Sequence, residues 1–255
     1  MGETVQSISR LFAILNAFSF DRTEMTLSEI AEAVDLPVST AARFISTMLQ
    51  DGYLKKDGRN YYLGHKLFYL GSIAALQFNM DRTVEPIMKE LAAVTNDYVS
   101  LNVLSQYHRV CVKKVEGDAS IRMFVKVGEP LPLYAGSAGK VLLAYQPEEY
   151  WDEYFALVKP KPLTPNTETD VDKIRQALKK IRVDGYCLTI GERISGTISV
   201  SAPIFDKDRT VKACLTIGKV RLDEEDNECY LAEIVKMAAQ KTSTEMGYIK
   251  QVRGD

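Results

Sequence analysis

The sequence contains few of the side chains that build disulfide frameworks or metal sites. Only two of its 255 residues are histidines, His65 and His108, and its four cysteines form no C-x-x-C pair. The cysteines lie far apart in the chain: Cys111, Cys187, Cys214 and Cys229. This usage argues against a disulfide framework and against a zinc site, which needs three or four such ligands. We therefore expect no metal and no cofactor.

Long apolar runs and a strong excess of one charge are absent as well. No apolar run reaches the roughly 18 residues of a membrane span, and the first residues, MGETVQSISRLF, lack the segments of a signal peptide. The formal net charge is −2, so the chain as a whole is not a polycation. We expect a cytoplasmic protein without a membrane partner, in which any attraction to nucleic acid comes from a local basic patch.

A helix-turn-helix is predicted after a first amphipathic helix over residues 5–19. The first helix is indicated by apolar residues at helical spacing: Ile8, Leu11, Phe12, Leu15 and Phe18. Thr26 and Glu29 then form a T-x-x-E capping box, which starts a second helix. Leu36-Pro37 ends that helix, because the residue before a proline is disfavoured in the α region. A third helix follows, and its expected buried face comprises Val38, Ala42, Ile45, Met48 and Leu49.

A β-hairpin is predicted directly after the third helix. Gly52 is placed to end that helix, as glycine commonly does. The segments 53–56 and 59–63 read as strands, and Asp57-Gly58 between them is a strong hairpin-turn signal. A helix-turn-helix followed by a hairpin is a winged arrangement.

Charge within this first region is unevenly distributed. Residues 1–80 carry seven Lys/Arg and eight Asp/Glu, but residues 43–66 carry five positive and two negative side chains, a local charge of +3. Arg43 is suited to pair with guanine, and short hydroxyl side chains can reach bases or phosphates. The candidate DNA contacts are Thr26, Ser39, Thr40, Arg43, Thr47 and Arg59. The alternative is a helix-turn-helix whose polar face is simply solvated or binds protein.

The remaining chain predicts an α+β domain with a mostly antiparallel sheet flanked by helices. Strands are expected over residues 98–105, 109–117, 120–128, 197–205 and 211–218. Helices are expected over residues 66–79, 82–96, 138–145, 148–155, 170–183 and 225–246. Because the strands are grouped between the helices, an antiparallel sheet is favoured over alternating βαβ units.

The segment GSAGKV, residues 136–141, is not a phosphate-binding loop of the Walker A type. Only two residues separate its glycines, and Val141 replaces the Ser/Thr that would hold magnesium. Small residues at a helix N-terminus favour an anion such as a carboxylate. The alternative is that the glycines only allow close packing of the helix on the sheet.

A row of hydroxyl groups is predicted on one face of a strand. Alternation along TISVSAPIF puts Thr197, Ser199 and Ser201 on one face and Ile198 and Val200 on the other. These hydroxyls can contact a small polar ligand, or they can face water.

Three segments together resemble the IclR family of bacterial transcription regulators. They are TLSEIAEAVDLPVSTAARFISTMLQDGYL, LPLYAGSAGKVLLA and GYCLTIGERISGTISVSAPIFD, and the likeness spans roughly residues 5–248. The resemblance implies a winged helix-turn-helix DNA-binding domain (4–65), a linker helix (66–80) and an effector-binding GAF-like domain (81–250). By position, the family's pocket falls on Met123, Ser137, Ala138, Gly139, Thr189, Thr197, Ser199 and Thr216. Hydroxyls at Thr197 and Ser199 depart from the more apolar residues of some members, which leaves the ligand's identity open.

The expected function is therefore a ligand-responsive, sequence-specific DNA-binding regulator, most simply a repressor. We expect it to sense a small carboxylate and to bind a near-palindromic operator in double-stranded DNA as a homodimer or a dimer of dimers. Catalysis is not expected, because His108 and Cys111 at i, i+3 on an extended chain point to opposite faces. The alternative is a GAF-like sensor that acts as an enzyme or a protein-interaction module without DNA binding.

Overall fold

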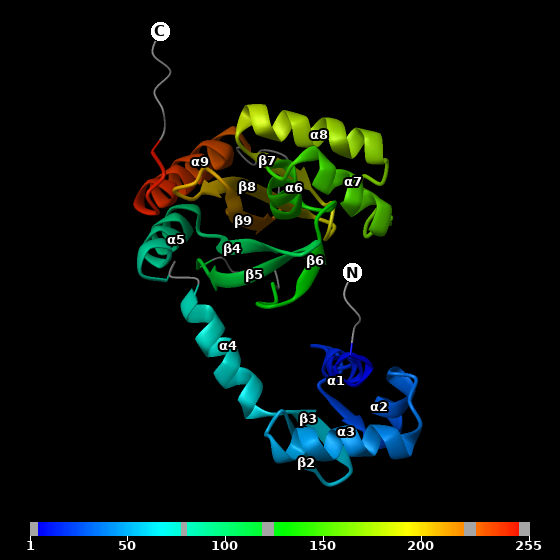
Figure 1. Ribbon diagram of the computed structural model, residues 1–255. Helices are drawn as coiled ribbons and strands as arrows, with labels where there is room; N and C mark the ends of the chain where they lie inside the picture. Colours follow the sequence, from blue (N-terminus) through cyan, green and yellow to red (C-terminus); the bar gives the residue numbers. More distant parts are fainter. Residues whose placement is uncertain (1–4, 78–80, 119–124, 222–227, 250–255) are drawn as a thin grey trace. The chain divides into compact units, whose positions relative to one another are not determined.

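The protein was analysed as a computed structural model that describes residues 5–77, 81–118, 125–221 and 228–249. The chain divides into two compact units, Met1–Asn79 and Met80–Asp255, each drawn in Figure 1. Each unit has its own buried apolar core. Among the described residues, no helix is both long and apolar enough to cross a membrane.

The first unit is a winged helix-turn-helix. Its elements are α1 (Gln6–Asn16), β1 (Glu24–Thr26), α2 (Leu27–Ala33), α3 (Val38–Gln50), β2 (Leu54–Asp57), β3 (Asn60–Leu63) and α4 (His65–Gln77). The predicted capping box is present, since the Thr26 Oγ1 accepts from the Glu29 N–H at 3.4 Å and the Glu29 carboxylate accepts from the Thr26 N–H at 2.7 Å. The predicted break at Leu36-Pro37 separates α2 from α3.

The hairpin differs from the prediction by one residue. Asp57 pairs with Asn60, so the turn consists of Gly58 and Arg59 instead of Asp57-Gly58. Gly58 has a φ of +56°, a conformation that favours glycine at the first turn position. Strand β1 was not predicted; it pairs with β3 and gives the sheet order β1-β3-β2.

The predicted buried faces of α1 and α3 are partly wrong. Ile8, Phe12 and Val38 are 52%, 56% and 48% exposed, whereas Ile14 and Ala41 are fully buried. The core of this unit takes α1 side chains only from Leu11 onward, so the first turns of that helix lie beyond it. Apolar periodicity marks a helix correctly but does not say how much of its stripe a small core can cover.

The second unit is a six-stranded antiparallel sheet with helices on both faces, which confirms the predicted α+β class. Its strands are β4 (Tyr98–Ser105), β5 (His108–Val115), β6 (Pro130–Pro132), β7 (Cys187–Ile190), β8 (Thr197–Phe205) and β9 (Val211–Val220). Its helices are α5 (Asp81–Thr95), α6 (Ser137–Ala144), α7 (Glu148–Leu157), α8 (Val171–Asp184) and α9 (Glu228–Glu245). The strand order is β6-β5-β4-β9-β8-β7.

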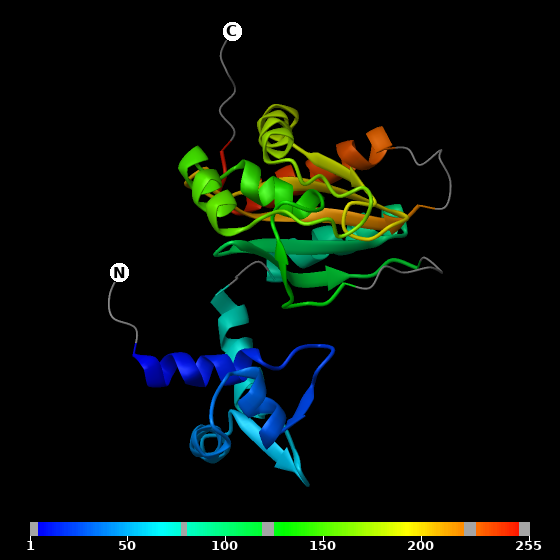
Figure 2. The ribbon, with the colours of Figure 1, turned by 90° about the vertical axis from the view of Figure 1, so that its right-hand side faces the viewer.

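Two separate cores form on the two faces of this sheet. Helices α5 and α9 cover one face, and α6, α7 and α8 cover the other, as Figures 1 and 2 show. Successive side chains of β9 alternate between the two faces of the sheet. Leu215 and Ile217 pack with α5 and α9, whereas Cys214 packs with α6 to α8.

Strand prediction was least successful at the sheet edges. The strand expected over residues 120–128 falls partly on 119–124, outside the described residues, and Val125–Gly128 are not in a strand. Strands β6 and β7 were not predicted, because β7 is short and β6 contains two prolines, which are tolerated only at an edge such as this one. The caps of α8 agree with expectation, with Asp170 at its start and Gly185 in the left-handed conformation at its end.

Candidate functional site

The first candidate surface lies on α3 of the first unit. Ser39, Arg43 and Thr47 are exposed, Thr40 is half-buried, and their spacing places them along one side of the helix. The Thr47 hydroxyl donates to the Arg43 carbonyl at 3.4 Å. The Arg43 guanidinium makes no ion pair within the described residues. It lies on a face of α3 that offers hydrogen-bond donors to an approaching partner.

The hairpin adds further cations to this unit. Lys55, Lys56 and Arg59 are all exposed. Tyrosines support both lysines: the Lys55 Nζ lies 5.0 Å from the ring centre of Tyr62, and the Lys56 Nζ lies 5.3 Å from that of Tyr61. Such cation–π contacts limit the freedom of the lysine side chains without neutralising their charge.

Two further residues bear on this surface: Thr26, whose hydroxyl also serves the predicted capping box, and Arg10, which the sequence did not indicate. The Thr26 hydroxyl donates to the Glu29 carboxylate at 2.7 Å and so is engaged in capping α2. Arg10 on α1 was not predicted, yet it lines the same groove as Thr40 and Arg43. A local charge count could have included Arg10, but nothing in the sequence placed α1 beside α3.

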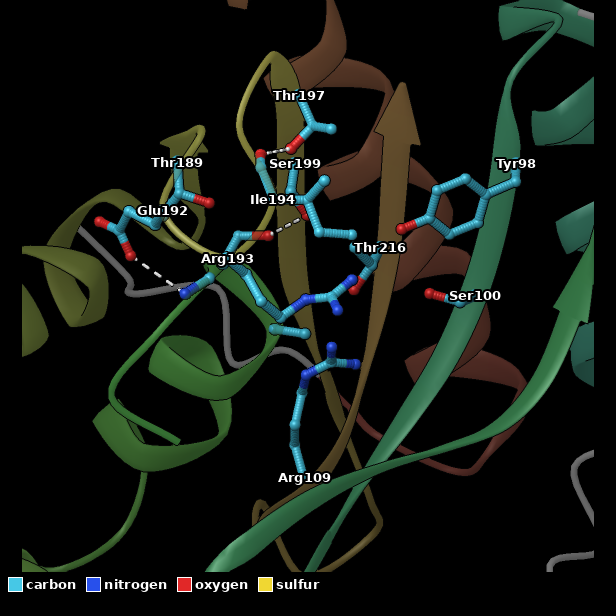
Figure 3. Close-up of a pocket in the computed structure, with 13 residues that line it drawn as sticks. Tyr98, Ser100, Arg109, Thr189, Glu192, Arg193, Ile194, Thr197, Ser199 and Thr216 are labelled. Atoms are coloured by element: carbon cyan, nitrogen blue, oxygen red, sulfur yellow. Dashed lines mark hydrogen bonds between the residues drawn. The ribbon is translucent and has the colours of Figure 1, made fainter. Parts of the chain in front are cut away.

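The second candidate site is a polar pocket between the sheet of the second unit and the start of α6. Thirteen of the described residues line it: Tyr98, Ser100, Arg109, Gly136, Ser137, Ala138, Thr189, Glu192, Arg193, Ile194, Thr197, Ser199 and Thr216. Figure 3 shows the side chains converging from β4, β5, β7, β8, β9 and the segment before β8. The space measures about 390 Å³ including its part open to solvent.

Six predicted pocket residues are brought together there. They are Ser137, Ala138, Thr189, Thr197, Ser199 and Thr216. Met123 lies outside the described residues. Gly139 does not line the pocket: a Cβ on it would lie 2.6 Å from the Leu133 carbonyl oxygen, so this glycine permits close packing of α6 on the preceding segment.

Two members of the predicted hydroxyl row, Thr197 and Ser199, line the pocket, and Ser199 and the fully buried Ser201 are hydrogen-bonded to hydroxyls of neighbouring elements. The Ser137 hydroxyl donates to that of Ser199 at 2.8 Å and lies 2.7 Å from that of Ser201. The Ser201 hydroxyl lies 2.8 Å from that of Thr216. The floor of the pocket is thus a chain of hydrogen-bonded hydroxyls that joins α6 to β8 and β9.

The same chain continues to a buried arginine. Asn102 donates from its Nδ2 to the hydroxyls of Ser100 at 3.0 Å and Thr216 at 3.1 Å, while its Oδ1 accepts from the Arg109 Nη1 at 2.6 Å. Asn102 is fully buried and Arg109 is 6% exposed. Both ends of the amide are engaged, so Asn102 holds the Arg109 guanidinium in a defined orientation.

A buried ion pair supports the start of α6. The Glu192 carboxylate accepts from the Gly136 N–H at 3.0 Å with one oxygen and pairs with the Lys140 Nζ through the other. Glu192 therefore has a structural role at the start of α6. Part of the anion-attracting N-terminus of α6 is already engaged by the protein's own carboxylate.

Sequence reasoning missed the pocket's cations and its tyrosine. The guanidinium groups of Arg109 and Arg193 and the Tyr98 hydroxyl point into the same space (Figure 3). Burial, and next the charge of Arg193, lower the pKa of Arg109. Burial likewise raises the pKa of Tyr98. No sequence signal joins these three residues, which come from β4, β5 and the segment before β8.

Comparison with known proteins gives matches to both units. The family model described as "Bacterial transcriptional regulator IclR C-terminal" matches residues 74–244, and the "IclR helix-turn-helix domain" matches residues 7–58. The HTH-type transcriptional regulator KdgR of Escherichia coli K12 is 31% identical over 250 residues, covering 96% of this chain and 94% of KdgR.

Two solved structures share the fold along nearly the whole chain. The crystal structure of the Thermotoga maritima IclR has a TM-score of 0.72 and 30% identity, covering 95% of this chain and 99% of that one. An IclR homologue from Microbacterium hydrocarbonoxydans, complexed with 4-hydroxybenzoate, has a TM-score of 0.82 and 24% identity, covering 94% of this chain and 98% of that one.

Proposed function

Since the chain belongs to the IclR family of bacterial transcription regulators and is itself a helix-turn-helix DNA-binding regulator, we propose that its second unit senses a small carboxylate. Binding of that acid in the polar pocket alters the affinity of the protein for its operator, most simply as the release of a repressor. The domain acts as a sensor and does not turn the acid over.

The observation that carries this proposal is the pair of arginines in the pocket. Arg109 and Arg193 aim guanidinium groups into one small space, and the only carboxylate among its described lining residues, Glu192, is already paired with Lys140. Guanidinium groups bind carboxylates with two parallel hydrogen bonds, which gives both affinity and orientation. The Microbacterium homologue of the same fold is likewise complexed with a carboxylate, 4-hydroxybenzoate.

DNA recognition is assigned to α3 and the hairpin. The exposed face of α3 presents Ser39, Arg43 and Thr47 to a major groove, and Arg59 at the hairpin turn reaches the adjoining backbone. Thr40 lies at the edge of this face, and Thr26 contributes by holding the start of α2.

A symmetric dimer would present two such α3 helices to a near-palindromic operator. Apolar side chains on α4 support this assignment, since Phe68 is 82% and Tyr69 57% exposed. Exposed aromatic side chains of this kind are typical of surfaces covered in an assembly.

The test is a selection of genomic fragments with purified protein, with and without pooled organic acids. We expect enrichment of a near-palindromic site and a change in its recovery when the effective acid is present. Failure to enrich any fragment, together with measurable turnover of a bound acid, would instead identify an enzyme on this fold.

A thermal-shift screen of small organic acids tests the pocket separately. Acids that raise the melting temperature of the wild-type protein should lose much of that effect in Ser199→Val, which removes a hydroxyl at the pocket floor. Acids whose effect is indifferent to this substitution bind elsewhere, and a screen with no active acid would contradict the sensing role.

A further inference from the structure

The charge of the pocket is unbalanced, and this imbalance restricts the class of ligand. Of its thirteen lining residues, only Arg109, Glu192 and Arg193 carry a full charge. The Glu192 carboxylate is held by Lys140 and the Gly136 N–H, so that ion pair is neutral. Two positive charges, one from each arginine, are left facing the space.

The free-energy cost of burying a positive charge is greatest at Arg109. Its side chain is 6% exposed, and within the described residues its only hydrogen bond is the one from Nη1 to Asn102, a neutral amide. The second guanidinium, on Arg193, has no hydrogen bond or ion pair in the described part of the chain. A buried cation beside another cation and without a counter-charge is unfavourable, so the site gains most from a ligand that brings negative charge.

The donors that remain available all suit an anion. The hydroxyls of Ser137, Ser199 and Thr216 are engaged in the floor network, and that of Thr197 donates to the Ile194 carbonyl at 2.7 Å. The groups that keep a donor facing the space are the two guanidiniums, the hydroxyls of Thr189 and Ser199 (the latter only accepts from Ser137), and the Tyr98 hydroxyl, which makes no hydrogen bond within the described residues.

The absence of a side chain at Gly218 leaves space for the Tyr98 ring. A Cβ on Gly218 would lie 2.3 Å from the Tyr98 hydroxyl oxygen, so only glycine at this position in β9 leaves room for the ring. The phenol is thereby brought across β9 toward the two arginines, where it can donate to a carboxylate (Figure 3).

Arg193 lies on a short segment that is hydrogen-bonded at both ends: the Gly191 N–H donates to the Thr197 carbonyl at 2.7 Å, and the Gly196 carbonyl accepts from the Arg221 N–H at 2.8 Å. The Thr164 hydroxyl donates to the Gly191 carbonyl at 2.6 Å, which anchors the start of the segment. Gly191 and Gly196 have φ values of +64° and +71°, so both ends use conformations that favour glycine. The Arg193 side chain can adjust to a ligand while its backbone stays tied to the domain.

We propose that the ligand is a short-chain dicarboxylate, with one carboxylate bound by Arg109 and the other by Arg193, and with Tyr98 donating to one of them. This inference rests on the proposed sensing function and restricts its ligand to dianions. A monocarboxylate would leave one of the two positive charges without a partner. The small space favours a short chain, because it measures about 390 Å³ including its part open to solvent, at the lower end of the range of small-molecule pockets.

The test is isothermal titration calorimetry on the full-length protein with succinate and butyrate, which have equal chain length and differ by one carboxylate. We expect succinate to bind about tenfold or more tightly than butyrate, because it adds one set of charge-assisted hydrogen bonds. Malonate and glutarate report the preferred length, and inorganic phosphate reports whether any dianion suffices.

The matched variants are Arg193→Met and Arg209→Met, the latter at an exposed turn between β8 and β9. In Arg193→Met, the affinity for succinate should fall about tenfold, to that of butyrate, while butyrate binding stays within about twofold of wild type. Arg209→Met should bind both acids as the wild type does. Arg193→Lys should recover part of the preference, since it restores charge without the planar fork.

The outcomes separate this inference from the proposed function. Equal binding of succinate and butyrate by wild type, or tighter binding of phosphate than of every dicarboxylate, would overturn the dicarboxylate assignment. If succinate and butyrate bind equally, the proposal that the domain senses a carboxylate still stands. Binding of no carboxylate at all by a protein that still retains operator DNA would overturn sensing itself, and the dicarboxylate assignment with it.

Discussion

Individual residues of the pocket divide into those that face the ligand and those that hold the others in place. Asn102 orients Arg109 through a 2.6 Å hydrogen bond, and Gly218 makes room for Tyr98. Glu192 and Lys140 form a pair whose side chains are 13% and 6% exposed. Polar groups so thoroughly buried stabilise a protein only while every partner is present.

The Glu192–Lys140 pair gives a prediction on stability. Glu192→Gln keeps an acceptor for the Gly136 N–H but leaves the Lys140 ammonium buried without a counter-charge. We expect a loss of about 3 kcal/mol in the free energy of unfolding, measured by urea denaturation. The double variant Glu192→Gln/Lys140→Met should recover part of this loss. Equal stability of wild type and Glu192→Gln would show that the pair contributes nothing.

Gly139 gives a second prediction at the same scale. Gly139→Ala brings a methyl group to within 3 Å of backbone atoms of Pro132 and Leu133, which cannot yield as a flexible side chain would. We expect destabilisation of about 1–3 kcal/mol in the same assay. Gly71→Ala is the control, because its Cβ meets nothing within 4 Å in α4, so that substitution should stabilise by up to about 1 kcal/mol. A neutral Gly139→Ala would show that α6 can shift.

At the scale of elements, the DNA-binding unit depends on how α3 and the hairpin present charge. The helix brings Arg43, and the hairpin brings Lys55, Lys56 and Arg59, from segments that are close in sequence. The acidic residues of the unit are concentrated earlier, since residues 21–35 carry five negative side chains and one positive. Attraction to phosphate depends on this local separation and not on the net charge of the chain.

Arg43→Ala should lower operator affinity without unfolding the unit, because the side chain is exposed. We expect a loss of about 1–3 kcal/mol, roughly 5- to 150-fold, in a gel-shift titration across salt concentrations. Arg22→Ala is the matched control: this exposed arginine lies in the acidic segment, where it pairs with Glu29 at 3.7 Å. Similar affinities for the two variants would contradict the role given to α3.

The exposed apolar face of α4 leads to a prediction on assembly. Phe68→Glu places a charge at a position that is 82% exposed in the single chain and covered in the proposed dimer. We expect the dimer dissociation constant to rise at least about fivefold, measured by analytical ultracentrifugation. Val183→Glu on α8, at a side chain 86% exposed, is the control and should leave self-association unchanged. If both variants dimerise as the wild type does, α4 is not part of the interface.

For the whole molecule, the proposed function requires that ligand binding in the pocket of one unit change DNA binding by the other. A ligand can shift this equilibrium only by its difference in affinity between the DNA-competent form and the other form. Coupling of this kind is reciprocal, so the operator must change the affinity for the acid by the same factor as the acid changes the affinity for the operator.

This reciprocity is itself a prediction. Typical coupling of 1–3 kcal/mol corresponds to roughly 5- to 150-fold in each affinity. Titration of the acid into protein saturated with operator, and of operator into protein saturated with acid, should give equal factors within error. Unequal factors would indicate a further linked equilibrium such as a change of oligomeric state. A factor of one in both titrations would mean that the pocket does not regulate DNA binding.

Local patterns in the sequence determined the parts of this protein that depend on near neighbours. The capping box at Thr26, the break at Pro37, the hairpin and the hydroxyl face of β8 all follow from rules that act over a few residues, and the structure has them. The hairpin turn and the faces of α1 and α3 were less accurate, because they depend on where a small core ends.

Only the tertiary structure decided which charges meet. Arg109 and Arg193 are 84 residues apart and come together because the segment before β8 and the Arg109 side chain lie over the same face of the antiparallel sheet. Tyr98 reaches them only where Gly218 pairs with it across β4 and β9. Strand order and register arise from long-range packing, which single-sequence periodicity does not encode, so the two arginines that we propose bind the ligand became visible only in the folded domain.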